Sequence, residues 1–209
     1  MGRFDNAGLG WGQMVALVRE DWEQHQRDWT QPGFRALAVY RFGLWQRSIQ
    51  GTTLRVKLLR KATRFVYRFV HRYVRNHYGI ELHRSATIGR RLRIAHQGTI
   101  VIHLTAQIGD DCLIRHGVTI GAASNFKEED APRLGDRVNV GAGAMILGSI
   151  TIGDDVRIGP NAVVLMDVPP NSTVFAPPAR IIEAPPDDRH SGTAPERTSA
   201  PGPGLFGNE

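Results

Sequence analysis

The sequence predicts a parallel β-solenoid in the second half of the chain, preceded by a helical region. The first observation is an apolar residue at every sixth position, in one block of three and one of six: Ile108, Ile114, Ile120, Leu134, Val140, Ile146, Ile152, Ile158 and Val164. The second is that glycine follows six of these nine residues. A period of six fits neither the alternation of a strand nor the stripe of a helix, so it indicates short strands separated by tight corners. Such coils are stable only when they stack around a common core.

Helices are expected before the solenoid, over residues 11–29, 33–50 and 54–79. The breakers Gln31-Pro32-Gly33 and Gly51-Thr52-Thr53 separate them. Charge is concentrated in this region, because residues 1–78 carry 14 Lys and Arg against 5 Asp and Glu, whereas the whole chain has a net charge of +6. The cations therefore belong to the helices.

The third of these helices is amphipathic. Its apolar stripe and its cationic face follow helical spacing: Leu58, Ala62, Phe65, Phe69 and Tyr73 on one side, and Lys57, Lys61, Arg64, Arg68, Arg72 and Arg75 on another. Six cations on one face suit an anionic membrane surface or a lipid-linked pyrophosphate. The same cations are compatible with a solvated face, or with a face that meets acidic groups of the first helix: Glu20, Asp21, Glu23 and Asp28. A nucleic acid partner is not expected, because no recognition motif accompanies the charge.

Length and composition narrow the class of protein. The 209 residues, 41% of them apolar, are enough for a sizeable core, and no stretch reaches the roughly 20 apolar residues of a membrane span. The first ten residues lack the apolar run of a secretory signal, which favours a cytoplasmic protein, with helix 54–76 as a peripheral contact to the inner membrane surface. The expected domains are a helical region at 1–78, a β-helix at 79–182 and a disordered, Pro- and Gly-rich tail at 183–209. The single cysteine, Cys112, falls at a small-residue position of the repeat, where a thiol serves as a packing group.

Chemistry is expected where the repeat is disturbed. Ile94 and Ile108 are 14 residues apart instead of 12, and the extra pair falls beside His96. An imidazole that projects from an irregular coil can act as a general base for a hydroxyl group, and a carboxylate on its other nitrogen fixes the tautomer. Glu81, fifteen residues before His96, is the candidate for that carboxylate. The second disturbance, residues 122–132, must leave the coil as a loop that borders a cleft.

Four segments between Gly79 and Ile182 stand out: IELHRSATIGRRLRIAHQGTIVI, LIRHGVTIGA, VNVGAGAMILGSITIGDDVRIGPNAVVLMDVPPNS and FAPPARII. Together they resemble the serine acetyltransferase family of hexapeptide-repeat acyltransferases. The resemblance implies a left-handed parallel β-helix and a homotrimer or a multiple of it. It also implies acetyl-CoA as a co-substrate, bound in the groove between neighbouring subunits, and no metal.

The resemblance assigns roles to individual residues. His96 matches the family's catalytic histidine, and Glu81 stands where the family has an aspartate that orients it. The implied mechanism is direct: His96 takes the proton of the acceptor hydroxyl, the oxygen attacks the thioester, and backbone N–H groups stabilise the oxyanion. The residues that match positions along the coenzyme groove are Ala122, Ala142, Pro160 and, as a phosphate partner, Arg180. Pro160 has no N–H to donate there.

The departures from the family concern the acceptor. Ala95 replaces an aspartate of the serine-specific enzymes, and Asp130 and Ala131 replace an arginine and a histidine that hold the amino acid's carboxylate. A zwitterionic serine needs an anion for its ammonium group and a cation for its carboxylate. We therefore expect an acetyl-CoA-dependent O-acetyltransferase whose acceptor is a hydroxyl of a sugar, a glycan precursor or another non-serine metabolite. The alternatives are serine O-acetylation in cysteine biosynthesis and a β-helix binding scaffold without catalysis.

Overall fold

The computed structural model describes residues 9–122 and 131–182. The chain divides into two compact units, residues 1–176 and residues 177–209. The first unit holds the helices and the described strands, and the second is described only over 177–182. The tail predicted at 183–209, and most of the loop predicted at 122–132, lie outside the described residues.

Three helices precede the strands, as the sequence predicts: α1 (Trp11–Gln24), α2 (Pro32–Ser48) and α3 (Leu54–Tyr78). The second helix begins at Pro32 itself, because proline has no N–H to satisfy and its fixed φ suits the first helical turn. Thr53 caps α3 by accepting a hydrogen bond from the backbone N–H of Val56, and Gly79 ends it in the left-handed conformation at φ 62°. No helix among the described residues is long and apolar enough to span a membrane.

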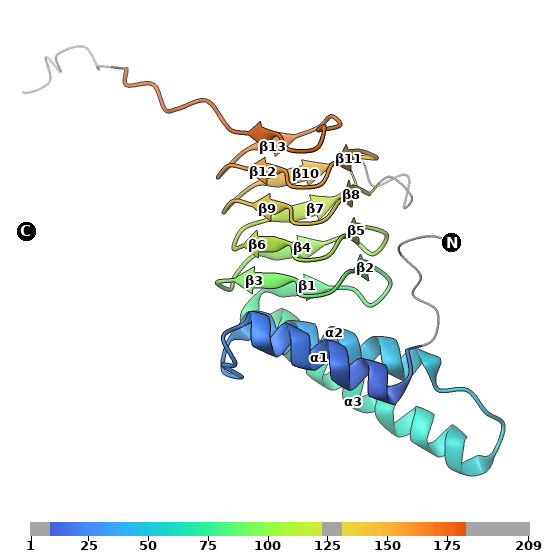
Figure 1. The fold of residues 1–209 in the computed structure, drawn as a ribbon. Helices are drawn as coiled ribbons and strands as arrows, with labels where there is room; N and C mark the ends of the chain where they lie inside the picture. Colours follow the sequence, from blue (N-terminus) through green and yellow to red (C-terminus); the bar gives the residue numbers. More distant parts are fainter. Residues whose placement is uncertain (1–8, 123–130, 183–209) are drawn as a thin grey trace, which may run out of the picture. The chain divides into compact units, whose positions relative to one another are not determined.

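The strands are short and parallel, and they form three sheets around one axis (Figure 1). The first sheet has the order β1 (Ile80–Leu82), β4 (Ile100–Ile102), β7 (Thr119–Gly121), β10 (Met145–Leu147) and β13 (Val163–Val164). The second runs through β2 (Thr87–Ile88), β5 (Gln107–Ile108), β8 (Arg133–Leu134) and β11 (Thr151–Ile152). The third runs through β3 (Arg93–Ala95), β6 (Leu113–Arg115), β9 (Asn139–Val140), β12 (Arg157–Ile158) and β14 (Thr173–Val174). This is the left-handed parallel β-helix that the sequence analysis expects.

The six-residue repeat fills the core of the solenoid. All nine repeat residues between Ile108 and Val164 are at most 3% exposed. The register stacks them directly, since Ile114 pairs with Val140 and Val140 with Ile158. Cys112 is 1% exposed, which confirms that its side chain packs in the core, and this burial raises the pKa of the thiol to about 12.

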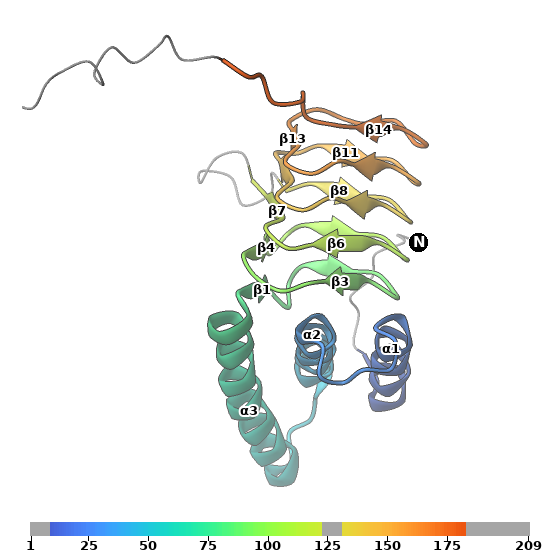
Figure 2. The ribbon, with the colours of Figure 1, turned by 90° about the vertical axis from the view of Figure 1, so that its left-hand side faces the viewer.

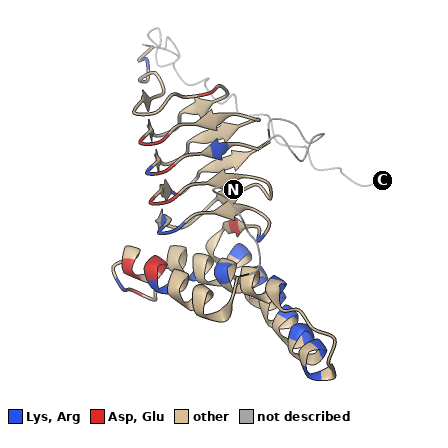
Figure 3. Cartoon of the chain, turned by 45° about the vertical axis from the view of Figure 1, so that its right-hand side comes forward, with Lys and Arg blue, Asp and Glu red and all other residues tan. Residues whose placement is uncertain are grey.

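Charged residues line one corner of the solenoid and tie successive coils together (Figure 3). The backbone N–H of Arg90 donates to Asp110 at 2.7 Å, that of Asp110 to Asp136 at 2.9 Å, and that of Asp136 to Asp154 at 2.8 Å. The ion pairs beside this ladder are Arg91 with Asp111 and Arg137 with Asp155. The corner thus satisfies backbone donors that a tight turn leaves without a partner in a sheet.

Buried polar contacts hold the first two helices on the first coil. Arg41 of α2 pairs with Asp21 of α1, with Nε and Oδ2 2.9 Å apart, and both side chains are at most 2% exposed. The same guanidinium donates to the carbonyl oxygen of Ile88 at 2.8 Å. His25, at the end of α1, accepts a hydrogen bond through Nε2 from the backbone N–H of Ile94 at 3.2 Å. These contacts fix the corner between α1 and α2 against β3.

The acidic residues of the α1 region do not face the cations of α3. They bind elsewhere: Glu20 to Arg90 and Arg91, Asp21 to Arg41, Glu23 to Arg19 and Arg27, and Asp28 to Thr30. Of the alternatives for the cationic face of α3, contact with these acids is therefore wrong. The physical reason is that α2 lies between α1 and α3 (Figure 2).

Candidate active site

His96 lies at the corner where the repeat is disturbed. The extra pair of residues falls between β3 and β4, and the chain there passes through the left-handed region three times, at His96 (φ 68°), Gly98 (φ 108°) and Thr99 (φ 53°). Histidine is among the residues that tolerate this conformation, and the equivalent corners of the next coils have a single left-handed residue each, such as Gly117 and Gly143. The His96 side chain is exposed, so the corner presents the imidazole to the surface as the sequence analysis predicts.

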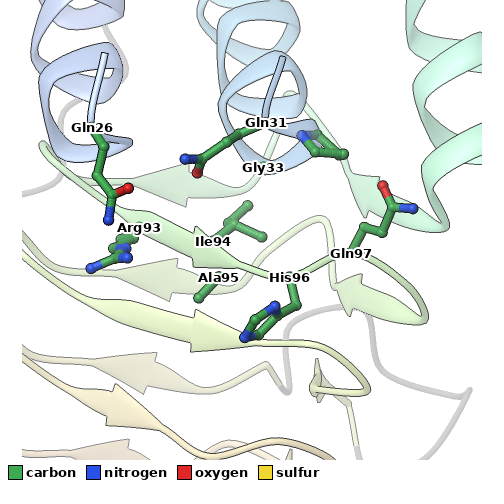
Figure 4. Close-up of a pocket in the computed structure, with 9 residues that line it drawn as sticks. Gln26, Gln31, Gly33, Arg93, Ile94, Ala95, His96 and Gln97 are labelled. Atoms are coloured by element: carbon green, nitrogen blue, oxygen red, sulfur yellow. The ribbon is translucent and has the colours of Figure 1, made fainter. Parts of the chain in front are cut away.

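A cavity of about 500 Å³ lies beside this corner (Figure 4). Its residues come from two distant parts of the chain: Gln26, Gln31, Pro32 and Gly33 from the α1–α2 corner, and Arg93, Ile94, Ala95, His96 and Gln97 from the solenoid. Gly33 permits this close approach, because a Cβ there would lie 2.3 Å from the carbonyl oxygen of Ile94. The helical corner therefore forms one wall of the cavity and the catalytic candidate lies on the other.

A second histidine stands next to His96. The rings of His96 and His116 are 5.8 Å apart between centroids and nearly perpendicular. His103, the other histidine near the disturbance, instead contacts Thr105, with Nδ1 and Oγ1 3.0 Å apart. Among the described residues, no group of three or more His, Cys, Asp and Glu side chains is arranged to hold a metal ion.

Glu81 lies on β1, where it pairs in register with Val101 of β4, and its side chain is exposed. Within the described part of the chain no hydrogen bond or ion pair joins Glu81 to His96, and Glu81 does not line the cavity beside His96. The carboxylate–imidazole pair therefore stays a prediction.

A second cavity, of about 330 Å³, lies further along the third sheet. It is lined by Arg115, Asn139, Gly141, Ala142, Arg157, Ile158, Gly159, Pro160 and Thr173. Two of the predicted coenzyme positions, Ala142 and Pro160, thus lie in one cavity. They belong to neighbouring coils, since the backbone N–H of Asn161 donates to the carbonyl oxygen of Ala142 at 2.9 Å.

The other two predicted coenzyme positions are not in this cavity. Ala122 directly follows β7 and is half-buried, at the edge of the undescribed segment 123–130. Arg180 is exposed and belongs to the unit 177–209. Their roles remain predictions.

The two cavities follow one another on the same sheet. Ala95 of β3, which lines the first cavity, pairs in register with Arg115 of β6, which lines the second. The surface along β6, β9 and β12, which we call the track, therefore leads from the second cavity to the strand that precedes His96. Arg115 and Arg157 give this track a positive charge, which suits a phosphate-bearing ligand.

Of the three positions predicted to contact the acceptor, one lines the first cavity. Ala95 lines the first cavity, whereas Ala131 is 6% exposed and packs in the core. Asp130 lies outside the described residues. Among the residues that line the first cavity in the described part of the chain there is no Asp or Glu.

Sequence reasoning missed Arg93 and the two glutamines of the helical corner. Arg93 lines the first cavity and is half-buried, and the described residues give it no ion-pair partner. Its position two residues before Ala95, on the same face of β3, is a signal that strand alternation could have supplied. Gln26 and Gln31 carry no such signal, because only the packing of the helices on the first coil brings them to His96.

Comparison with known proteins agrees with the fold. A family model described as bacterial transferase hexapeptide (six repeats) matches residues 131–165. A serine acetyltransferase of Helicobacter pylori is 45% identical over 151 residues, which cover 72% of this chain and 81% of that protein. One of Mycobacterium tuberculosis is 40% identical over 153 residues, covering 72% of this chain and 61% of that protein.

Solved structures of serine acetyltransferases also resemble this chain. Serine acetyltransferase of Neisseria gonorrhoeae in complex with serine matches with a TM-score of 0.62 and 30% identity, over 81% of this chain and 69% of that one. The chain therefore belongs to the serine acetyltransferase family of acetyl-CoA-dependent O-acyltransferases.

Proposed function

We propose that the protein transfers the acetyl group of acetyl-CoA to the hydroxyl group of L-serine, with His96 as the general base. His96 takes the hydroxyl proton while the oxygen attacks the thioester carbonyl carbon. The C–S bond then breaks, and the proton passes to the sulfur of coenzyme A. No covalent intermediate with the enzyme is required. The observation that carries the proposal is the exposed His96 imidazole at the end of a cationic track, in a chain whose relatives are named serine acetyltransferases.

Arg93 supports an acceptor with a carboxylate. Asp130 and Ala131 stand where the serine-specific enzymes have a cationic pair, and this difference disfavours serine. Arg93 supplies a guanidinium in the His96 cavity that could hold this carboxylate instead. One charged hydrogen bond contributes about 1.5–3 kcal/mol, which corresponds to roughly 10- to 150-fold in affinity.

A second candidate acceptor is a hydroxyl compound without an ammonium group, such as a sugar or a glycan precursor. The specific observation in its favour is Ala95, because the described lining of the cavity offers no carboxylate for the ammonium group of serine. The amide oxygens of Gln26, Gln31 and Gln97 are weaker partners for an ammonium ion, but they are well suited to hydroxyl groups.

We further propose that the functional unit is a trimer in which a neighbouring subunit covers the coenzyme track. Both cavities lie on the surface of a single chain, so the track has no second wall among the described residues of one subunit. Light scattering on the purified full chain is expected to give the mass of three chains or a multiple of three. A monomer that retains full activity would contradict this part of the proposal.

The acceptor is tested by measuring the release of the coenzyme A thiol with L-serine, free hexoses and nucleotide sugars. L-serine is expected to give the highest kcat/KM. His96→Asn is expected to lower kcat by about 10² to 10⁴, because general-base catalysis contributes that much. Asparagine is the suitable replacement because it tolerates the left-handed backbone at this position.

Arg93→Gln is expected to raise the KM for L-serine by at least about tenfold with a smaller effect on kcat. Arg133→Gln is the matched control, because Arg133 is exposed on β8 and lines neither cavity. A sugar that exceeds L-serine in kcat/KM would establish the second candidate. If no acceptor gives thiol release while acetyl-CoA still binds, the remaining interpretation is a binding scaffold without catalysis.

A further inference from the structure

Within the described residues 9–122 and 131–182, one face of the third helix has no partner. The helix packs on α2 through Tyr67, and a Cβ on Gly43 would lie 2.5 Å from that ring. The opposite face carries large apolar side chains that are 48–82% exposed, and we call them the α3 stripe: Leu54, Leu58, Leu59, Phe65, Val66, Phe69 and Tyr73. An apolar patch that follows a helix for its full length indicates an interaction surface.

The same helix is strongly cationic. Between Leu54 and Tyr78 there are eight Lys and Arg residues and no Asp or Glu: Arg55, Lys57, Arg60, Lys61, Arg64, Arg68, Arg72 and Arg75. Within the described residues none of these eight side chains forms an ion pair, and all but Arg60 are exposed. Figure 3 shows them along α3 with no acidic residue on the helix. The acidic residues of α1 that could neutralise them are held by other arginines.

We propose that α3 docks on the surface of an anionic lipid bilayer. The α3 stripe enters the boundary between headgroups and acyl chains, while the cations at its sides bind lipid phosphates. A helix that combines a large apolar face with Lys and Arg, and that is too polar to span, binds in the plane of the interface. With 25 residues, α3 is about 37 Å long, so several lipids contact it at once.

A small cavity shows how one lipid headgroup fits. Phe65, Phe69, Arg68 and Arg72 surround a space of about 220 Å³ on the exposed face. The two guanidinium groups, four residues apart, can bind a phosphate, and the two rings lie beside them for the adjoining acyl chain.

Charge complementarity favours lipid over a second copy of the chain. A two-fold contact between two α3 stripes would bring eight cations against eight, with no acidic residue on either helix to separate them. A contact of the α3 stripe with another face of a neighbouring copy is the alternative that light scattering tests below. On an anionic bilayer, each cation near the surface instead contributes roughly 1 kcal/mol, which raises the binding affinity about fivefold. The bilayer is therefore the occupant that accounts for both the apolar and the charged residues.

The test is flotation of the full chain with phosphatidylglycerol-containing vesicles and with pure phosphatidylcholine vesicles. The protein is expected to float with the anionic vesicles, less at high salt, and much less with the neutral ones. Lys61→Gln/Arg68→Gln is expected to weaken binding about 30-fold, because two cations are lost. Arg19→Gln/Arg27→Gln is the matched control: it removes two cations that are 76% and 70% exposed on the α1 side, and binding should stay as in the wild type.

Phe65→Ser/Phe69→Ser separates the apolar contribution from charge and is expected to reduce flotation at any salt concentration. Light scattering on the same variant reports on the oligomer. Equal flotation of the wild type and both α3 variants would overturn the proposal. A wild type that does not float, together with dissociation of the oligomer in Phe65→Ser/Phe69→Ser, would overturn it in favour of a contact between copies.

Discussion

The spacing of the coils at the second cavity, where we predict the coenzyme, gives the sharpest prediction, through Gly141→Ala. Gly141 follows the repeat residue Val140 and lines the second cavity. A Cβ at this position would lie 2.6 Å from the carbonyl carbon of Gly159 and 2.6 Å from the nitrogen of Pro160, both backbone atoms of the next coil. Ordinary contacts of this kind begin at 3.4 Å. The coils must therefore separate by about 0.8 Å here, because backbone atoms cannot rotate away as a flexible side chain does.

The cost follows from this displacement. Overpacking of a well-packed core costs about 1–3 kcal/mol, and for a unit of this size each kcal/mol lowers Tm by roughly 2–4 °C. We expect Gly141→Ala to lower Tm by about 2–12 °C. Because Gly141 lines the predicted coenzyme track, the KM for acetyl-CoA should rise as well.

Two matched variants separate these effects. Gly121, like Gly141, directly follows a repeat residue, but a Cβ on Gly121 would meet only side-chain atoms at 4.0 Å. The Tm of Gly121→Ala should therefore stay constant or rise. Gly135→Ala creates a comparable clash, 2.8 Å from the backbone nitrogen of Asp154, away from both cavities, so Tm should fall without a change in KM. Equal Tm values for Gly141→Ala and Gly121→Ala in thermal unfolding would refute the reasoning from coil spacing.

Two further predictions concern the contact between the helices and the first coil. Asp21→Ala leaves the Arg41 guanidinium buried without its carboxylate and should cost about 3–5 kcal/mol in denaturant unfolding; a loss below 1 kcal/mol would show that solvent reaches this contact. Burial lowers the pKa of His25, so the unfolded chain binds its proton more readily than the folded protein. Its stabilising contribution is complete above about pH 6.5 and is lost as the pH falls through the lowered pKa. Lowering the pH from 7.5 to 5 should therefore lower the Tm of the wild type more than that of His25→Gln. Curves of Tm against pH that run parallel for the two proteins would contradict this.

Much of the fold could be predicted from the sequence because each coil repeats the same local requirement. Residues such as Ile114 and Val140 recur every six positions since each must point to the axis, and the structure buries all of them. The position of His96 was predictable for a related reason. Two extra residues in one corner break the period, and this corner contains three left-handed residues where the equivalent corners contain one, such as Gly117 or Gly143.

The walls of the site could not be predicted in this way. Gln26 and Gln31 reach the His96 cavity only because Arg41, Asp21 and His25 hold the helices on the first coil. No periodicity encodes these contacts, since their partners are 20 to 70 residues apart and each contact occurs once.

The sequence by itself determined the solenoid, its core and the corner that carries His96, because these follow from a pattern repeated along the chain. Only the tertiary structure decided which face of α3 is covered. The helix has more apolar surface than α2 can bury. Packing against Gly43 of α2 buries Tyr67 and leaves Phe65 and Phe69 exposed. Tertiary packing likewise placed Arg93 in the cavity with His96, and on this placement rests the proposal that a carboxylate of the acceptor binds there.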